Sequence, residues 1–163
     1  AYVYANYFLC RKITSNERIS LLKNASDKFH LKLYTHHPAR ELPNAEYMGP
    51  IDYYNAMPLV FQNSLINLNI TLKSIQTGIP LRCMDIMGSG SFLLTNFQSD
   101  FLDYFIPGED FAYYESSDDF IKKITYYLSH EKERQQIIAN CLGKMRDAHT
   151  FEHRVRTILN IVI

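Results

Sequence analysis

Residues 65–96 read LINLNITLKSIQTGIPLRCMDIMGSGSFLLTN, and this stretch decides the fold. Residues 65–72 alternate apolar and polar side chains, which predicts a strand with one face on the core. Residues 81–87 have the apolar spacing of a short helix, and the Gly88-Ser89-Gly90 turn ends it. Residues 91–94 are apolar enough to form a strand that is buried on both faces. A strand, a helix and a strand in so short a stretch indicate a βαβ unit with parallel strands.

The same alternation of strands and helices continues on both sides of this unit. Right-handed crossovers between parallel strands would place helices on both faces of the sheet. The predicted fold class is therefore α/β: a Rossmann-like, doubly wound parallel sheet of about six strands with helices on both faces and a helical C-terminal tail. The further strands are expected at residues 2–8, 31–34, 47–50 and 111–114, and the further helices at residues 18–29, 53–61, 100–105, 118–128, 131–146 and from 151 onward.

Local signals refine the boundaries of these helices. Thr14 or Ser15 is expected to cap the helix at 18–29, because a hydroxyl there can accept an N–H of the first turn. Ser117 is expected to cap the helix at 118–128 for the same reason. Pro58 is expected to interrupt the helix at 53–61, since proline lacks an N–H and clashes with the preceding turn.

The composition describes an ordinary globular domain. The chain has 163 residues with 47% hydrophobic side chains, and 17 basic residues balance 17 acidic ones. This balance excludes a disordered chain and gives no electrostatic signature of nucleic-acid or anionic-lipid binding. No apolar run approaches the ~18 residues of a membrane span. Because three well-separated cysteines do not suggest a disulfide framework, a reducing compartment and therefore a cytoplasmic location are expected.

In a doubly wound sheet, a ligand binds outside the carboxyl ends of the strands. The loop at 77–85 is the most informative of those that would lie there. Gly78 allows a tight backbone, and Pro80 suits a helix start that leaves the N–H groups of Leu81 and Arg82 free to hold an anion. Asp85, one turn later, could accept hydrogen bonds from a sugar diol; the alternative is a plain connection with a solvated Asp85. The loops to search are those at residues 8–14, 34–38, 49–53, 71–82 and 96–100.

The predicted loop after the first strand carries Asn6, Arg11 and Lys12. Two cations there could neutralise phosphate charge on a leaving group, and the alternative is a solvated basic pair. His149 and His153 lie four residues apart and His36 and His37 are adjacent, but no Cys or Glu has ligand spacing to either pair, so no metal and no other cofactor is predicted. The chain also lacks a G-x-S-x-G elbow, a P-loop and a G-x-G-x-x-G fingerprint.

The stretch GIPLRCMDIMGSGSFLLTN at 78–96 resembles the C-terminal donor-binding domain of GT-B glycosyltransferases. It is most similar to the CgeB-like (spore maturation) branch, which has an Arg near the start of this helix and a following "flltn" strand. The run at 101–154, FLDYFIPGEDFAYYESSDDFIKKITYYLSHEKERQQIIANCLGKMRDAHTFEHR, is similar to that branch almost throughout, including the closing His149-Thr150 with Arg154. The run YANYFLCRKITSNERISLL at 4–22 resembles the first strand and helix of the same domain.

The resemblance implies that residues 1–163 form the nucleotide-sugar-binding half of a glycosyltransferase, with UDP-sugar as the expected donor. Because the chain starts in a strand-like segment without Met, an N-terminal domain is expected to precede it. That domain would bind the acceptor, which is a glycan or a protein. Arg11 and Lys12 would be the catalytic cations that steady the leaving diphosphate. The donor-binding residues would be Asn6, Tyr53, Gly78, Ile79, Leu81, Arg82 and Asp85.

Two positions depart from the wider GT-B signature, which has a Glu at each. Thr77 stands where the first Glu is found, and the shorter Asp85 stands where the ribose-binding Glu is found. These differences leave two classes of function open. One is an active glycosyltransferase domain, and the other is a non-catalytic Rossmann-like module in spore or cell-surface assembly.

Overall fold

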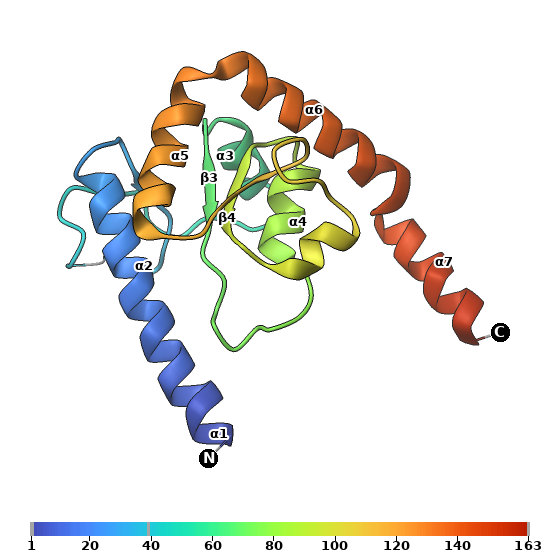
Figure 1. The fold of residues 1–163 in the computed structure, drawn as a ribbon, viewed down its shortest axis with the longest axis horizontal. Helices are drawn as coiled ribbons and strands as arrows, with labels where there is room; N and C mark the ends of the chain where they lie inside the picture. The colour runs from blue at the N-terminus through green and yellow to red at the C-terminus, as the bar shows by residue number, and fades with distance from the viewer. Residues whose placement is uncertain (1, 39, 163) are drawn as a thin grey trace.

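The structure, a computed structural model, describes residues 2–38 and 40–162 (Figure 1). In these residues the strands all run parallel and form two separate sheets. The smaller sheet pairs β1 (Lys32–Leu33) with β2 (Glu46–Tyr47). The larger sheet has the order β3-β4-β5 and consists of β3 (Asn67–Asn69), β4 (Leu93–Asn96) and β5 (Ala112–Tyr114). The α/β class and the parallel pairing are thus confirmed. The expected number of about six strands in one sheet is not, since five strands are seen in two sheets.

Helices make up most of the remaining chain. Three of them, α5, α6 and α7, follow one another after β5 and form the predicted helical C-terminal tail (Figure 1). No helix of the described residues has both the length and the apolar character needed to cross a membrane. The helical segments are α1 (Tyr2–Tyr4), the π-helix η1 (Ala5–Leu9), α2 (Cys10–Ser26), α3 (Met57–Gln62), α4 (Leu81–Gly88), the 3₁₀ helix η2 (Ser99–Asp103), α5 (Ser117–Ser129), α6 (Glu131–Ala148) and α7 (Phe151–Val162).

The βαβ unit at 65–96 forms as predicted. α4 crosses from β3 to β4, and the two strands pair in parallel with Asn67 opposite Leu93. Successive side chains of a strand point to opposite faces, so Leu93 and Leu94 enter different cores, and both are buried. This places helices on both faces of the larger sheet.

Two apolar clusters fill the space between the sheet and these helices. The first lies between the sheet and α2 and α5, and the second lies between the sheet and α3, α4 and α6. The first cluster contains Leu21, Ala25, Ile70, Phe92, Leu94, Ala112, Tyr114, Phe120, Ile124, Tyr127 and Ile137. The second contains Met57, Phe61, Cys83, Ile86, Met87, Leu93, Phe101, Phe105, Phe111, Cys141 and Met145.

The predicted first strand at residues 2–8 is wrong, because the chain is helical from Tyr2 through Ser26. Thr14 and Ser15 therefore lie inside a helix and cap nothing. The Thr14 hydroxyl instead donates to the Cys10 carbonyl oxygen one turn earlier, at 2.7 Å. The side chains of Tyr4, Tyr7 and Phe8 are exposed, and within the described residues no strand lies beside this segment to pair with it.

Two smaller boundary predictions are also corrected. Pro58 lies in the first turn of α3, where its missing N–H costs nothing, so it begins the helix instead of interrupting it. Ser116, and not Ser117, caps α5: its hydroxyl accepts the N–H of Asp119 at 3.2 Å.

Candidate functional site

The first turn of α4, which follows the loop after β3, presents free backbone donors. Pro80 has extended backbone angles, and its carbonyl oxygen accepts the N–H groups of Cys83 and Met84. The N–H groups of Leu81 and Arg82 come too early in the helix to have an acceptor within it. Leu81 itself is 78% exposed. This helix end can therefore receive an anion from solvent.

Gly78 shapes the loop that leads into α4. Its φ of +85° lies in the left-handed region, which a side chain disfavours. The Gly78 N–H donates to Oδ2 of Asp100, in η2, at 2.5 Å. Ile79, the next residue, packs against the second apolar cluster. The loop is thus held on one side by a hydrogen bond and on the other by core packing.

Three polar side chains meet beside this helix start. The Tyr53 hydroxyl donates to Asp85 Oδ2 at 2.7 Å, and Arg82 Nε lies 3.9 Å from the same oxygen. The hydrogen bond to Asp85 is the main cause that raises the pKa of Tyr53, because the carboxylate stabilises the protonated phenol. The cluster is accessible to ligands, since the Arg82 side chain is 47% exposed.

The Arg82 guanidinium keeps donors available. It lies over the Phe61 ring, at 5.7 Å from the centroid, and its Nε is too far from Asp85 Oδ2 for a hydrogen bond. A guanidinium has five N–H donors in a planar fork that matches phosphate oxygens. Backbone N–H groups, a helix N-terminus and an arginine together can hold a diphosphate.

The structure brings together only part of the predicted site. Tyr53, Gly78, Ile79, Leu81, Arg82 and Asp85 lie on α4, on the loop before it or in direct contact with it.

Asn6, Arg11 and Lys12 lie elsewhere, on η1 and α2, so their predicted loop does not exist. Asn6 Oδ1 is 4.0 Å from the thiol of Cys10, and Arg11 lies over the Tyr7 ring at 4.7 Å. Within the described chain, no hydrogen bond or ion pair joins these three residues to the cluster on α4.

A second polar region was missed by the sequence prediction. It is a cleft of about 250 Å³ at the carboxyl ends of β4 and β5, between α2 and the loop after β3. We call it the polar cleft. Its lining residues are Glu17, Lys73, Asn96, Phe97, Tyr114 and Glu115.

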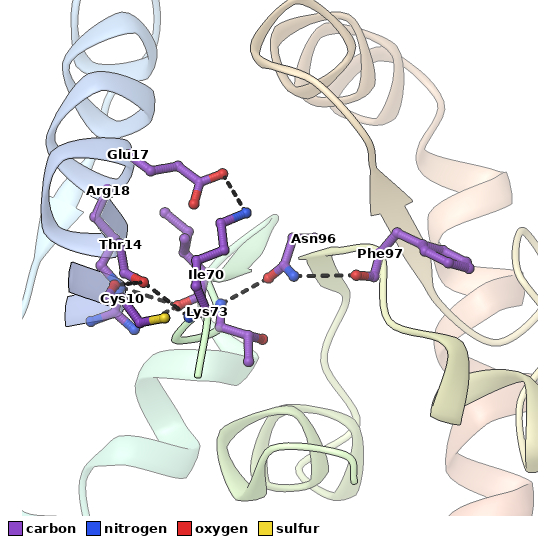
Figure 2. Close-up of polar contacts among 9 residues, drawn as sticks. Cys10, Thr14, Glu17, Arg18, Ile70, Lys73, Asn96 and Phe97 are labelled. Atoms are coloured by element: carbon purple, nitrogen blue, oxygen red, sulfur yellow. Dashed lines mark hydrogen bonds and ion pairs between the residues drawn. The ribbon is translucent and has the colours of Figure 1, made fainter. Parts of the chain in front are cut away.

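Hydrogen bonds from α2 and β4 fix the loop beside the polar cleft (Figure 2). Thr14 Oγ1 accepts the N–H of Lys73 at 3.0 Å, and the Arg18 guanidinium donates to the carbonyl oxygen of Ile70. From the other side, Asn96 Oδ1 accepts the N–H of Thr71 at 2.8 Å. The expectation that a ligand binds at the carboxyl ends of the strands did indicate the loops at 71–82 and 96–100, but it gave no signal for Glu17 or Tyr114.

The histidines do not assemble into a metal site. Nδ1 of His149 and Nη2 of Arg154 lie 2.8 Å apart, and Nδ1 of His153 lies 2.6 Å from the Thr150 hydroxyl. No group of three or more potential metal ligands occurs in residues 2–38 and 40–162. That the protein functions without a metal ion stays a prediction.

Comparisons with known proteins agree with this architecture. The model of a family described as glycosyl transferase-like matches residues 11–160. No curated protein matches the chain. Among solved structures, the chain is similar to the C-terminal domain of a glycosyl transferase group 1 family protein (LpcC) from Francisella tularensis, with a TM-score of 0.54 and 18% identity. The match covers 66% of this chain and 55% of the Francisella chain, so this chain spans about half the length of that relative.

Proposed function

The chain belongs to the glycosyl transferase-like family, and on that premise we propose that it binds a nucleoside-diphosphate sugar at the start of α4 and acts in glycosyl transfer. The observation that carries the proposal is the contact of Tyr53, Arg82 and Asp85 beside the unpaired N–H groups of the first helical turn. This arrangement combines donors for a diphosphate with an acceptor for a diol.

Each group has a role in the proposed complex. The N–H groups of Leu81 and Arg82 and the Arg82 guanidinium bind the diphosphate oxygens. Asp85 accepts hydrogen bonds from the ribose hydroxyls, and the Tyr53 hydroxyl orients its carboxylate. When the bond from the sugar to the diphosphate breaks, negative charge grows on the leaving group. The arginine and the positive end of the helix dipole stabilise that charge.

The finer features of the proposal rest on the resemblance in sequence. UDP-sugar is the proposed donor, and the CgeB-like branch is the proposed subgroup. A glycan or a protein accepts the sugar, on a domain that precedes this one, and no metal takes part. Arg11 and Lys12 are kept as candidate cations for the leaving group, although they lie on α2 and not beside α4.

A non-catalytic binding module is the second candidate. Thr77 favours it, because a threonine replaces a carboxylate of the wider signature. Such a module would still bind nucleotide at α4 but would not transfer the sugar.

Calorimetry with the 163-residue chain tests the proposal. UDP and GDP are titrated into the wild type, Arg82→Ala, Asp85→Ala and a control, Arg146→Ala, which removes an exposed arginine near the end of α6. Loss of a charged hydrogen bond is expected to weaken UDP binding about tenfold or more in the first two variants and to leave the control unchanged. Equal binding by all four proteins would overturn the proposal. UDP binding without transfer from UDP-sugar by the full-length protein would favour the non-catalytic module.

A further inference from the structure

The last helix, α7, is joined to the rest of the described chain mainly through Arg154. No residue of α7 is buried, and Figure 1 shows the helix leaving the end of α6 and running away from the larger sheet. Within the described residues, its other side-chain hydrogen bonds and ion pairs stay inside residues 150–162. The direction of α7 therefore depends largely on what Arg154 contacts. The exposed apolar side chains that α7 carries are Phe151, Val155, Ile158, Leu159, Ile161 and Val162.

Arg154 contacts His149, which lies at the junction of α6 and α7. Nη2 of Arg154 lies 2.8 Å from Nδ1 of His149, and the guanidinium carbon lies 5.9 Å from the centroid of the Tyr104 ring. Because an arginine stays protonated in proteins, it is the donor and Nδ1 is the acceptor. An imidazole that accepts a hydrogen bond at Nδ1 is neutral and carries its proton on Nε2. The contact therefore requires the neutral form of His149.

The His149 ring is anchored to the body of the protein. Its backbone N–H donates to the Met145 carbonyl oxygen at 3.0 Å, which completes the last turn of α6. The ring packs against Phe105, with the centroids 5.0 Å apart, and against the ring of Tyr104 at 5.3 Å. Phe105 is 1% exposed and belongs to the second apolar cluster. His149 is thus the fixed half of the contact, and Arg154 is the half that belongs to α7.

The groups that face His149 disfavour its protonation. They are Arg154 and His153 on α7 and the Tyr104 phenol at the end of η2, while residues 146–147 on α6, an arginine and an aspartate, are exposed. Burial, and then Arg154 and His153, lower the pKa of His149, and no carboxylate of the described residues counters them. Since an ordinary histidine has a pKa of about 6.5, His149 is neutral at pH 7 and becomes charged only on acidification.

We propose that His149 and Arg154 form a pH-sensitive latch that fixes the direction of α7. At neutral pH the imidazole accepts the guanidinium N–H, and the first turn of α7 is held beside the end of η2. When a proton binds to Nδ1, two cations face each other and neither can accept a hydrogen bond, so the contact breaks. The helix is then free to turn about residues 149–150, and its exposed apolar side chains change position relative to the rest of the chain. The latch goes beyond the proposed nucleotide site, with which it shares no residue.

NMR of the ¹⁵N-labelled chain between about pH 7.5 and about pH 4.5 tests the latch. The heteronuclear ¹⁵N–¹H NOE reports whether the amides of α7 move on the ps–ns timescale independently of the body. We expect α7 and α6 to give equal values at the higher pH, and α7 alone to give lower values at the lower pH. The loss should follow the titration of the His149 ring protons. Values for α7 that do not change with pH, or that fall together with those of α6, would overturn the proposal.

Variants identify the group that titrates. Asparagine keeps an acceptor, Oδ1, near the position of Nδ1 and does not titrate, so His149→Asn should hold α7 at both pH values. Arg154→Ala should free α7 at both. The controls are His153→Asn, which removes the neighbouring histidine, and Arg156→Ala, whose arginine pairs with Glu152 on α7 itself; both should behave as the wild type. A pH-dependent loss that persists in His149→Asn, or that disappears in His153→Asn, would refute the latch.

Discussion

Replacement of Thr14 by valine tests how α2 holds the loop between β3 and α4. The Thr14 side chain is 1% exposed, and valine has nearly its shape. The substitution removes the acceptor of the Lys73 N–H, at 3.0 Å, and also the hydroxyl that donates to the Cys10 carbonyl oxygen at 2.7 Å. Of these two hydrogen bonds, only the one to Lys73 joins segments far apart in the sequence (Figure 2).

The expected cost follows from what is left unpaired. An unsatisfied buried N–H costs about 1–3 kcal/mol. Because the Lys73 residue is itself exposed, the lower part of that range applies, about 1–2 kcal/mol. In a chain of this size, each kcal/mol lowers the melting temperature by about 2–4 °C. The amide of Lys73 should also exchange faster with solvent, since it loses its acceptor.

Thr125→Val is the matched control. The Thr125 hydroxyl makes the same type of bond, to the Ile121 carbonyl oxygen at 2.9 Å, but it accepts no backbone N–H and is exposed. Urea denaturation and amide exchange of both variants give the comparison. If Thr14→Val and Thr125→Val differ by less than about 0.5 kcal/mol, the hydrogen bond from α2 does not hold the loop.

Three further predictions concern buried and ionisable side chains. Phe101→Ala should cost about 3–5 kcal/mol in urea denaturation, because the ring is fully buried in the second apolar cluster. Burial, and then the charge of Arg154, lower the pKa of His149 in the folded protein. The stability that the neutral imidazole contributes is therefore present above the pKa of the unfolded state and is lost as the pH falls through the lower pKa of the folded state. His149→Phe should lose less stability than the wild type between pH 7 and pH 5. Burial raises the pKa of Cys83 to about 12, so iodoacetamide should label Cys10, which is partly exposed, well before Cys83 in mass spectra.

The central βαβ unit could be predicted because its signals are local. The alternation at 65–72 reports a strand with one buried face, and Pro80 and Gly88 mark the limits of the helix between the strands. The start of α4 could be predicted as an anion site for the same reason, since a helix N-terminus after a strand is visible in a short window of sequence. The resemblance placed both Tyr53 and Asp85 at the donor site, but neither it nor the spacing predicted the hydrogen bond between them.

The N-terminal segment shows where local signals fail. Aromatic and β-branched residues favour strands because they pack against a neighbouring strand, and no strand of the described part of the chain lies beside Tyr4 or Tyr7. Without such a neighbour, helical hydrogen bonds satisfy the backbone within the segment itself. The polar cleft was missed for a related reason: Glu17 and Tyr114 meet only because α2 packs on the larger sheet.

The most direct test of the nucleotide site is a ¹⁵N NMR titration of the chain with UDP, compared with inorganic phosphate. Binding at the start of α4 predicts saturable shifts at the amides of Gly78, Leu81 and Arg82 with UDP, which are larger than those with phosphate and are lost in Arg82→Ala. If UDP leaves these amides unchanged while the protein is folded, the nucleotide does not bind at α4 and the proposed function is wrong.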